Sequence, residues 1–460
     1  MTRTPDVVVL GGGSGGYACA IRAAQLGLAV TLVESAKLGG TCLHRGCIPT
    51  KALVHAGEVV ETIRDSSRFG VLGSLDGIDM ERVHSYKNGV VGKLFQGLQG
   101  LIRHHGIEVV SGHGRYVGNK TVDVDGEPIE ARRAVVLATG SQPRTIPGLP
   151  IGDRIMTSDD ALELSQIPSR AVILGGGVIG VEFAGLLDAL GTEVTVVEAL
   201  PRLVASEDEW SSKRLARAFR KRGIDVRTST KVLDAHQTGA TVTISMDAGE
   251  KIDTDLLLVA VGREPRTVDS GVAQAGVALD RGHIVVDDQL RTNHDGVWAV
   301  GDVVAGLQLA HRGFQQGLYV AEQIAGHNPP PLEETGIPRV TYTSPEIASV
   351  GLTEAQAREK YGDVTTAEYD LAGNGKSQIL GTAGGIKLIR AGNNDQDGPV
   401  VGIHMVGDRI SELVGQAQLI VNWNAHPEDV AALIHAHPTQ SEALGEAHLA
   451  LAGQPLHAHG

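Results

Sequence analysis

The residues of this chain best placed to carry out chemistry are two cysteines, Cys42 and Cys47, separated by four residues. They lie in the segment 39–51, which reads GGTCLHRGCIPTK. Two thiols at this spacing at a helix start lie within disulfide reach, and the positive end of the helix dipole lowers thiol pKa values. Zinc would need four soft ligands and only two sulfurs lie nearby, so we predict no metal site. The flanking glycines and lysine favour a redox pair over two buried structural cysteines.

A dinucleotide-binding pattern occurs twice, at residues 6–34 and 170–198. Each copy reads as a buried strand, a G-x-G-x-x-G turn, a helix, a second strand and an acid. The first glycine permits a tight turn, the second lets a pyrophosphate approach the helix N-terminus, and the third lets the helix pack closely on the strand. These glycines are Gly11, Gly13 and Gly16, then Gly175, Gly177 and Gly180. One such turn is a weak signal, but two in the same context predict two nucleotide sites.

The acid that ends each copy, Glu34 or Glu198, can accept hydrogen bonds from ribose hydroxyls. A 2′-phosphate would be repelled by Glu198, where an NADP site would carry a basic residue. We therefore expect NAD at the second site, although Arg202 lies close enough in sequence to argue for NADP. Because the first copy ends just before the cysteine segment, electrons are expected to pass between sulfur and a bound nucleotide cofactor.

The bulk composition narrows the class of protein. A chain of 460 residues suggests about three domains. The formal charge of −14 argues against nonspecific nucleic-acid binding. The sequence contains no run of eighteen apolar residues, so we expect no membrane span. Three cysteines do not make a disulfide scaffold, so a reducing, cytoplasmic location fits best.

The order of apolar runs predicts the organisation of the chain. A buried strand at 134–140 is followed by a proline-rich linker at 143–150, and the second nucleotide unit continues through strands at 241–244 and 256–263. Another strand at 297–302 ends in Gly-Asp. Beyond residue 331 the pattern changes to strands near 339–343, 384–390 and 400–406 with helices near 410–424 and 427–434. This last stretch lacks a phosphate-binding turn and indicates a separate α+β module.

Four motifs together resemble those of the pyridine nucleotide-disulfide oxidoreductases, the flavoprotein disulfide reductases. They lie at 11–16, 39–51, 175–198 and 292–302. The resemblance implies an α/β fold with two Rossmann-like domains, for FAD and NAD, and a C-terminal α+β dimerisation domain. It divides the chain into an FAD domain with the redox disulfide at 1–150, an NAD domain at 151–270, a second part of the FAD domain at 271–340 and a dimer-interface domain at 341–460.

The same resemblance assigns the two cofactor sites. For FAD it implies Gly11, Gly13, Ser14, Gly16, Glu34, Gly40, Thr41, Lys51, Thr139, Gly140, Asp302, Leu309 and Ala310. For NAD it implies Gly175, Gly177, Val178, Ile179, Gly180, Glu198 and Gly262. Asp302 is expected to contact the ribityl or pyrophosphate region, and the helix that starts near Leu309 is expected to point at the flavin pyrimidine ring.

The resemblance also implies catalytic roles. Cys42 would exchange thiols with the substrate, and Cys47 would be the thiolate that faces the flavin. His437 would act as the base, with Glu442 fixing its tautomer, and in the family this pair reaches the cysteines of the opposite subunit of a homodimer. Lys51, paired with Glu182, would place a cation near flavin N5.

The stretch His437–Glu442 reads HPTQSE and resembles the dihydrolipoyl dehydrogenase branch of the family. That branch implies oxidation of protein-bound dihydrolipoamide by NAD⁺, with lipoyl-bearing components of 2-oxo acid dehydrogenase or glycine cleavage complexes as partners. The chain departs mildly from the pattern at Gln315-Gln316, where acids are common, and at Ser344, where histidine is common. A reductase of a small disulfide of the glutathione or mycothiol type is the alternative enzyme, and a scaffold subunit without chemistry is the alternative class.

Overall fold

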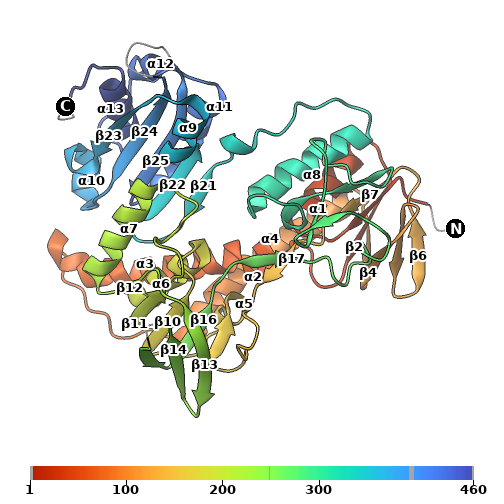
Figure 1. Ribbon diagram of the computed structural model, residues 1–460, viewed down its shortest axis with the longest axis horizontal. Coiled ribbons are helices and arrows are strands. Elements are labelled where there is room, and N and C mark those ends of the chain that lie inside the picture. The colour runs from red at the N-terminus through yellow and green to blue at the C-terminus, as the bar shows by residue number, and fades with distance from the viewer. Residues whose placement is uncertain (1–3, 248, 393–397, 458–460) are drawn as a thin grey trace.

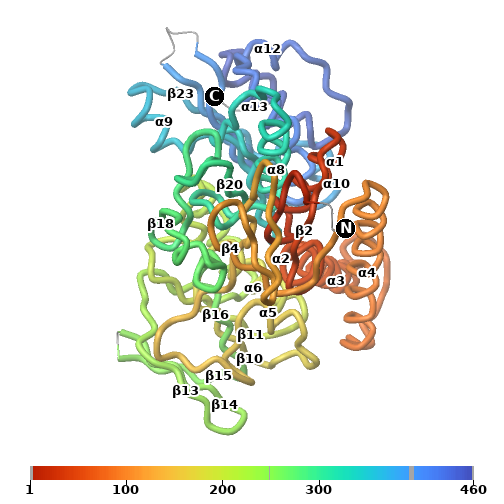
Figure 2. Tube along the Cα trace, turned by 90° about the vertical axis from the view of Figure 1, so that its right-hand side faces the viewer, coloured from red at the N-terminus to blue at the C-terminus, as the bar shows by residue number. Residues whose placement is uncertain are grey.

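Three five-stranded sheets, each covered by helices, form the three lobes of the molecule seen in Figure 1. The computed structural model describes residues 4–247, 249–392 and 398–457, so the outermost ends of the first and last expected domains lie outside the described residues. We call the three lobes the N-terminal, central and C-terminal domains. Figure 2 shows the C-terminal domain at one end of the molecule and the hairpin of the central domain at the other.

The N-terminal domain is a parallel sheet in the order β20-β7-β1-β2-β3. Its strands are β1 (Val7–Leu10), β2 (Val30–Glu34), β3 (Glu108–Ser111), β7 (Ala134–Leu137) and β20 (Val297–Ala299). The inner strands are apolar runs buried on both faces, as a parallel sheet covered by helices requires. β20 follows the central domain in the sequence, so two separate stretches of chain form the N-terminal domain. The domain boundaries expected from the sequence stay predictions.

Helices α1 (Ser14–Gln25) and α8 (Ala310–Ile324) lie side by side over this sheet (Figure 1). Helices α2 (Gly40–Arg45), α3 (Cys47–Asp65) and α4 (Met80–His104) then extend from it toward the central domain. A short 3₁₀ turn, η1 (Ser66–Phe69), follows α3, and η2 (Gly301–Val303) follows β20. A small antiparallel sheet of β4 (Gly114–Gly118), β5 (Thr121–Val124) and β6 (Glu127–Glu130) covers the outer side.

The central domain repeats the plan, with a parallel sheet in the order β12-β11-β10-β16-β9. Its strands are β9 (Ile155–Thr157), β10 (Arg170–Leu174), β11 (Glu193–Val197), β12 (Asp225–Arg227) and β16 (Leu256–Val259). Its helices are α5 (Ser158–Ala161), α6 (Val178–Leu190) and α7 (Glu209–Arg222). A three-stranded sheet packs beside it, formed by β13 (Val232–Thr238), β14 (Thr241–Met246) and β15 (Lys251–Thr254). An antiparallel ribbon of β8 (Ser141–Pro143) and β17 (Arg263–Pro265) connects the two parallel sheets. A short hairpin is formed by β18 (Leu279–Asp280) and β19 (His283–Ile284).

The C-terminal domain is an antiparallel sheet in the order β21-β22-β25-β24-β23. Its strands are β21 (Arg339–Thr341), β22 (Glu346–Gly351), β23 (Val364–Asp370), β24 (Gly385–Ala391) and β25 (Val400–Gly407). The covering helices are α9 (Glu354–Tyr361), α10 (Gly375–Leu380), α11 (Val414–Asn422), α12 (Pro427–Ala431) and α13 (Glu442–Leu451), with 3₁₀ turns η3 (Glu334–Gly336), η4 (Leu371–Gly373) and η5 (Ile410–Leu413). The sequence pattern located β21, β24 and β25 but not β22 or β23.

The third glycine of each nucleotide turn fixes the distance between helix and strand. A Cβ at Gly16 or Gly180 would overlap the carbonyl oxygen of Gly11 or Gly175, respectively. The first glycine of each turn has φ of +107° or +112°, which residues with a side chain rarely adopt. Both expected roles, the tight turn and the close helix contact, are thus confirmed by the backbone.

A buried polar network joins the central and C-terminal domains. Lys387 of β24 donates to Asp208 at 2.9 Å and to Glu354 of α9 at 2.7 Å, and the lysine and the aspartate are almost fully buried. Next to Asp208, the buried carboxylate of Glu207 accepts hydrogen bonds from Arg339 of β21 and from Ser349 of β22. The segment between Glu198 and α7 is therefore held by the C-terminal sheet.

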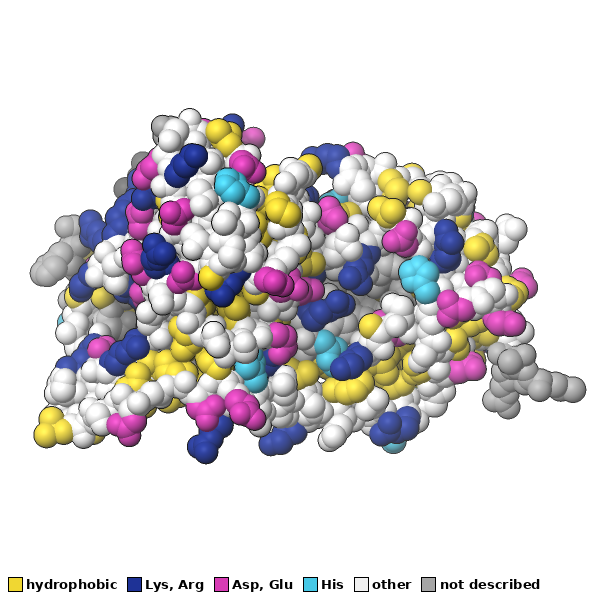
Figure 3. Space-filling view, turned by 90° about the horizontal axis from the view of Figure 1, so that it is seen from below, with side chains coloured by type: hydrophobic (Ala, Val, Ile, Leu, Met, Phe, Trp, Pro, Cys, Tyr) yellow, Lys and Arg dark blue, Asp and Glu magenta, His cyan; other side chains and the backbone are white. Residues whose placement is uncertain are grey.

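The charge on one face of the molecule and the character of the helices bear on the expectations from composition. On the face shown in Figure 3, acidic and basic side chains are interspersed. No helix in the described ranges has both the length and the apolar character that a bilayer crossing requires.

The close helix contact predicts unequal effects for two glycines of α6. Gly180→Ala should lower the free energy of unfolding by about 3 kcal/mol or more, because the new methyl group meets a backbone oxygen that cannot move away. Gly185→Ala, in the same helix with no atom within 4 Å of its Cβ position, should be neutral or stabilising by about 0.5–1 kcal/mol. Thermal and urea unfolding of both variants checks this, and equal stability of the two would contradict the packing argument.

Candidate functional site

One large cavity lies where the three domains meet. Its volume is about 1570 Å³, larger than the roughly 300–1,000 Å³ of most small-ligand pockets, which suits an extended dinucleotide. Of the expected FAD residues, all but Gly16 line it: Gly11, Gly13, Ser14, Glu34, Gly40, Thr41, Lys51, Thr139, Gly140, Asp302, Leu309 and Ala310. Cys42 and Cys47 line it as well. Gly16 is instead the glycine that lets α1 contact β1.

The first glycine turn provides a cradle for a phosphate group. Gly13 caps the N-terminus of α1 without a side-chain hydrogen bond, so the first backbone N–H groups of the helix remain available. No atom lies within 4 Å of the position that a Cβ on Gly13 would occupy. An uncapped helix start with open space before it attracts an anion through its N–H groups and its dipole. The residues present therefore fit a bound pyrophosphate.

The two acids that end the nucleotide units make equivalent contacts. Glu34 accepts hydrogen bonds from the backbone N–H groups of Gly12 at 2.7 Å and Ala36 at 2.8 Å. Glu198 accepts them from Gly176 at 2.6 Å and Leu200 at 2.7 Å. Each carboxylate is thereby fixed at the edge of its own glycine turn, where a ribose bound to that turn would lie.

The guanidinium of Arg202 is bound within its own segment of the chain. Its guanidinium donates to the backbone carbonyls of Ala205 and Glu207, each at 2.7 Å, and to Ser212 at 3.1 Å. These bonds fold the loop after Glu198 onto itself and occupy the arginine. Because its guanidinium is already bonded, Arg202 gives little support for NADP at the second site.

The second glycine turn lies at the border of the cavity. Val178 and Ile179, the first residues of α6, line the cavity, whereas Gly175, Gly177, Gly180, Glu198 and Gly262 lie outside its lining. Gly177 caps α6 without a side-chain hydrogen bond and has free space beside it, as Gly13 does in the first turn. The first glycine turn thus faces the large cavity, whereas the second faces a separate space that borders the cavity near the start of α6.

The two cysteines differ in their electrostatics. Cys47 is the first residue of α3, and both thiols are free and hydrogen-bonded to each other. The hydrogen bond from Cys42 and the nearby Lys51 lower the pKa of Cys47 to about 7, against the opposing effect of burial. The same hydrogen bond and burial raise the pKa of Cys42. The sequence predicts lowered pKa values for both thiols. The pKa of Cys47 is lowered, through Cys42 and Lys51, whereas that of Cys42 is raised, so the expectation is wrong for Cys42.

Lys51 and Glu182 form an ion pair of 2.6 Å at the deep end of the cavity. The Glu182 side chain is only 3% exposed, and its other oxygen accepts a hydrogen bond of 2.9 Å from the backbone N–H of Tyr342. Lys51 also lies 4.8 Å from the centre of the Tyr342 ring. The pairing expected from sequence is present, and it joins α3, α6 and the segment after β21.

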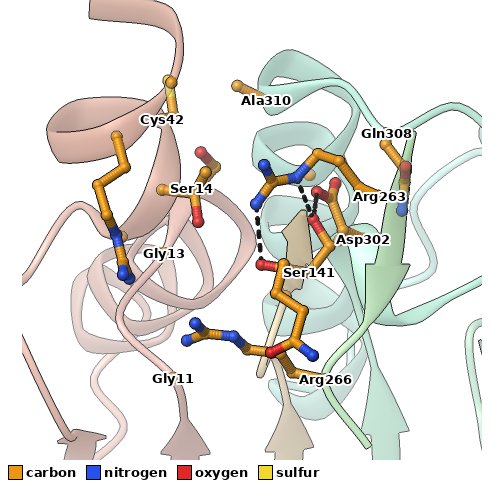
Figure 4. A pocket seen from close by; sticks show the side chains of 18 of the residues that line it. Gly11, Gly13, Ser14, Cys42, Ser141, Arg263, Arg266, Asp302, Gln308 and Ala310 are labelled. Atoms are coloured by element: carbon orange, nitrogen blue, oxygen red, sulfur yellow. Dashed lines mark hydrogen bonds between the residues drawn. The ribbon is translucent and has the colours of Figure 1, made fainter. Parts of the chain in front are cut away.

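Asp302 is anchored by two residues that the sequence did not single out. The Ser141 hydroxyl donates to Asp302 at 2.6 Å, and Arg263 donates to the Ser141 hydroxyl at 2.8 Å, as the dashed lines in Figure 4 show. Both follow strands of the parallel sheets, Ser141 after β7 and Arg263 after β16. The carboxyl ends of such strands gather at one edge, and this rule could have identified them.

The start of α8 closes the same side of the cavity. Leu309 caps the helix without a side-chain hydrogen bond, and Ala310 is its first residue. Gln316, one of the departures noted in the sequence, is fully buried and accepts a hydrogen bond of 2.7 Å from the N–H of Gly301. An amide at this position therefore holds the turn that carries Asp302.

His437 and Glu442 form a pair at the surface of the C-terminal domain. Nδ1 of His437 lies 2.7 Å from a Glu442 oxygen, and the other oxygen accepts a hydrogen bond from the Thr439 N–H. Burial opposes ionisation of Glu442, but these two contacts outweigh it and lower its pKa. The imidazole is 77% exposed, and neither residue lines the cavity of its own chain.

Comparison with known proteins identifies the class to which this fold and site belong. Residues 5–317 match the pyridine nucleotide-disulphide oxidoreductase family, and residues 337–448 match the dimerisation domain of that family. The chain belongs to the pyridine nucleotide-disulphide oxidoreductase family. The matched dimerisation domain supports a homodimer.

The similar proteins cover the chain almost completely. A dihydrolipoyl dehydrogenase of Bacillus subtilis is 39% identical over 99% of this chain and 100% of its own length, and one of Thermus scotoductus is 39% identical over 99% of both. The crystal structure of LpdA from Mycobacterium tuberculosis has a TM-score of 0.89 at 25% identity, covering 97% of this chain and 99% of that chain. A Cu(II) complex of the HOCl-induced flavoprotein disulfide reductase RclA from Escherichia coli has a TM-score of 0.88 at 27% identity, covering 98% and 100%.

FAD and NAD(H) are the cofactors of this family, and the fold is the mixed α/β arrangement with two nucleotide-binding domains and a dimerisation domain that the sequence predicted. When bound, FAD supplies the hydride chemistry that connects a dithiol to a nicotinamide.

The asymmetry of the thiol pair predicts a specific titration. In the reduced protein, alkylation should be directed to Cys47 with a midpoint near pH 7, because its thiolate is stabilised by Cys42 and Lys51. Cys42→Ala should move this midpoint to higher pH, since the hydrogen bond to the thiolate is lost. Cys19→Ala is the control, because burial raises the pKa of Cys19 to about 12 and keeps it unreactive. Mass spectrometry of the alkylated peptides checks the assignment, which fails if Cys42 is the thiol modified first.

Proposed function

We propose that this chain oxidises protein-bound dihydrolipoamide to lipoamide with NAD⁺ as acceptor, through FAD and the thiol pair Cys42 and Cys47. The observation that carries the proposal is the hydrogen-bonded, electrostatically unequal thiol pair in the wall of the dinucleotide cavity. The relatives that match the whole chain are named dihydrolipoyl dehydrogenase, which supports the same reaction.

The pKa order of the thiols fits a two-step exchange. A substrate thiolate attacks the sulfur of Cys42 in the Cys42–Cys47 disulfide, and Cys47 leaves as the better-stabilised thiolate. The second substrate thiolate attacks the substrate sulfur of the mixed disulfide, which closes lipoamide and releases Cys42. Cys42 takes up a proton, as its raised pKa favours. FAD, held by the first glycine turn and the other residues that line the cavity, would carry the two electrons of the Cys42 and Cys47 dithiol to NAD⁺.

His437 is proposed as the base that removes protons from the dithiol, with Glu442 as its positioning residue. The carboxylate on Nδ1 leaves Nε2 free to accept a proton and stabilises the imidazolium that forms. Because the imidazole is exposed on its own chain, the cavity it would serve is the one of the partner subunit, and the homodimer would be the active unit.

Lys51 is proposed to place a cation beside the flavin, where it would favour the reduced, anionic ring. Its ammonium is held by Glu182 and lies close enough to lower the pKa of Cys47. The bonds of Glu198 at its turn and the occupied guanidinium of Arg202 support NAD as the preferred acceptor.

The proposal also covers the protein partners of this chain and its location in the cell. Lipoyl-bearing components of 2-oxo acid dehydrogenase or glycine cleavage complexes would deliver the substrate, and a reducing cytoplasm would suit a pair of reversible thiols. A reductase of a small disulfide, of the glutathione or mycothiol type, is the alternative that shares the thiol pair.

Turnover with defined substrates tests the reaction. Purified protein should reduce NAD⁺ with dihydrolipoamide, more efficiently than NADP⁺, and should show little activity with glutathione or mycothiol. Cys42→Ser and Cys47→Ser should each abolish this turnover while FAD stays bound, because either change removes the disulfide. NADH production by either variant at the wild-type rate would exclude the thiol relay, and preferential reduction of mycothiol or glutathione disulfide would favour the alternative.

The proposed base predicts a selective defect. His437→Gln should slow the dihydrolipoamide half-reaction by about 10²–10⁴-fold, the usual contribution of a general base, and spare NADH-to-quinone activity. His457→Gln is a matched control, because His457 forms a similar exposed pair with Glu446 at 2.8 Å outside the motif. Stopped-flow measurement of each half-reaction separates the effects. An equal loss of both activities would show that His437 does not act in proton transfer.

A further inference from the structure

Arg266 occupies an unusual position in the wall of the cavity. It follows β17, after the buried Pro265, and its backbone is fixed to the segment after β7. Its N–H donates to the carbonyl of Gly140 at 2.9 Å, and its own carbonyl accepts a hydrogen bond of 2.7 Å from Thr139. The base of the side chain is therefore rigidly placed at the edge of two residues expected to contact FAD.

Within the described ranges, the guanidinium of Arg266 has no directly bonded partner, and the Asp159 carboxylate acts on it only through its charge. Among the residues that the structure describes, no carboxylate or carbonyl binds this guanidinium. The nearby Arg263 is bound to Ser141 and lies 4.0 Å from Asp159. Burial lowers the pKa of the Arg263 guanidinium, and the positive charge of Arg266 adds to this effect. Asp159 and Asp302 offset part of the positive charge of the two arginines, and the unbonded guanidinium of Arg266 leaves its N–H donors available for a further anion.

The opposite wall provides the complementary half of an anion site. Figure 4 shows the Arg266 side chain directed across the cavity toward the turn that carries Gly11 and Gly13. That turn ends at the uncapped start of α1, a helix long enough to carry a dipole, with open space beside Gly13. The guanidinium and the helix start thus face the same volume from two sides.

We propose that Arg266 binds the pyrophosphate of FAD from the wall opposite the first glycine turn and so retains the cofactor. A guanidinium suits this role because its fork of N–H donors matches phosphate oxygens. The inference rests on the FAD requirement of the family and on this cavity, and not on the identity of the dithiol substrate.

The geometry favours FAD over NAD as the nucleotide bound. The glycines of the second turn, Gly175 and Gly177, lie outside the lining of the cavity into which Arg266 points. The first turn, by contrast, forms part of that lining together with Glu34. A phosphate on the second turn would therefore face another space.

Release of FAD from the holoenzyme tests the proposal. Arg266→Gln should weaken FAD binding by about 10- to 100-fold, the range expected for charge-assisted hydrogen bonds to a phosphate, and Arg266→Lys should weaken it less. The readout is the rise of flavin fluorescence on dilution of the holoenzyme at low and high salt. The salt dependence of FAD affinity should be smaller in Arg266→Gln than in the wild type, since one ionic contact is missing.

The matched control is Arg281→Gln. Arg281 lines the rim of the same cavity but is already paired with Asp280 at 3.3 Å and is largely exposed, so this variant should keep wild-type FAD affinity. Apoprotein melting temperatures of both variants should equal that of the wild type, which separates cofactor loss from misfolding. Wild-type FAD affinity and salt dependence in Arg266→Gln would overturn the proposal, as would weakened NAD binding with unchanged FAD binding. Because wild-type FAD binding is measured directly, a different dithiol substrate would leave this test unaffected.

Discussion

The geometry of the site depends on one buried carboxylate. Glu182 sits at the start of α6, and its two oxygens are used by Lys51 from one domain and by the backbone of Tyr342 from another. A carboxylate that is 3% exposed must be fully satisfied, since loss of one partner of a buried ion pair costs about 3–5 kcal/mol. An arrangement of the three domains that separates these partners would leave the Glu182 carboxylate without them. The observed arrangement brings the helix of Cys47 up to the second nucleotide turn.

This placement gives the two thiols, Cys42 and Cys47, different roles. Position at the beginning of α3, proximity to Lys51 and a hydrogen bond from its neighbour all favour a negative charge on Cys47. Cys42 lies in a separate short helix and remains a donor. Two identical side chains five positions apart thus acquire opposite preferences because one donates the hydrogen bond that the other accepts. Exchange chemistry needs this difference, since a symmetrical pair would not define which sulfur leaves.

The sequence predicted most of what depends on local pattern and less of what depends on distant contacts. The glycine turns, the acids after the second strands and the thiol pair follow from short motifs, because tight turns and helix starts restrict which residues fit. Strands β22 and β23 were missed, since an antiparallel sheet assembled from separated segments leaves only short and ambiguous apolar runs. Ser141 and Arg263 were missed because their importance comes from strands that meet at one edge of the fold. The contrast between Cys42 and Cys47 could not be predicted from spacing, as it arises from a single hydrogen bond.

The network around Lys387 has a consequence for how the molecule loses its structure. If the C-terminal sheet melted while the central domain stayed intact, Glu207 would lose its ion pair with Arg339 and Asp208 its ion pair with Lys387. Partial opening at this junction is thus strongly disfavoured, and Glu182 imposes a similar penalty on the other side. The free energies of unfolding of the lobes are consequently coupled, because melting of one lobe removes charge partners from its neighbour.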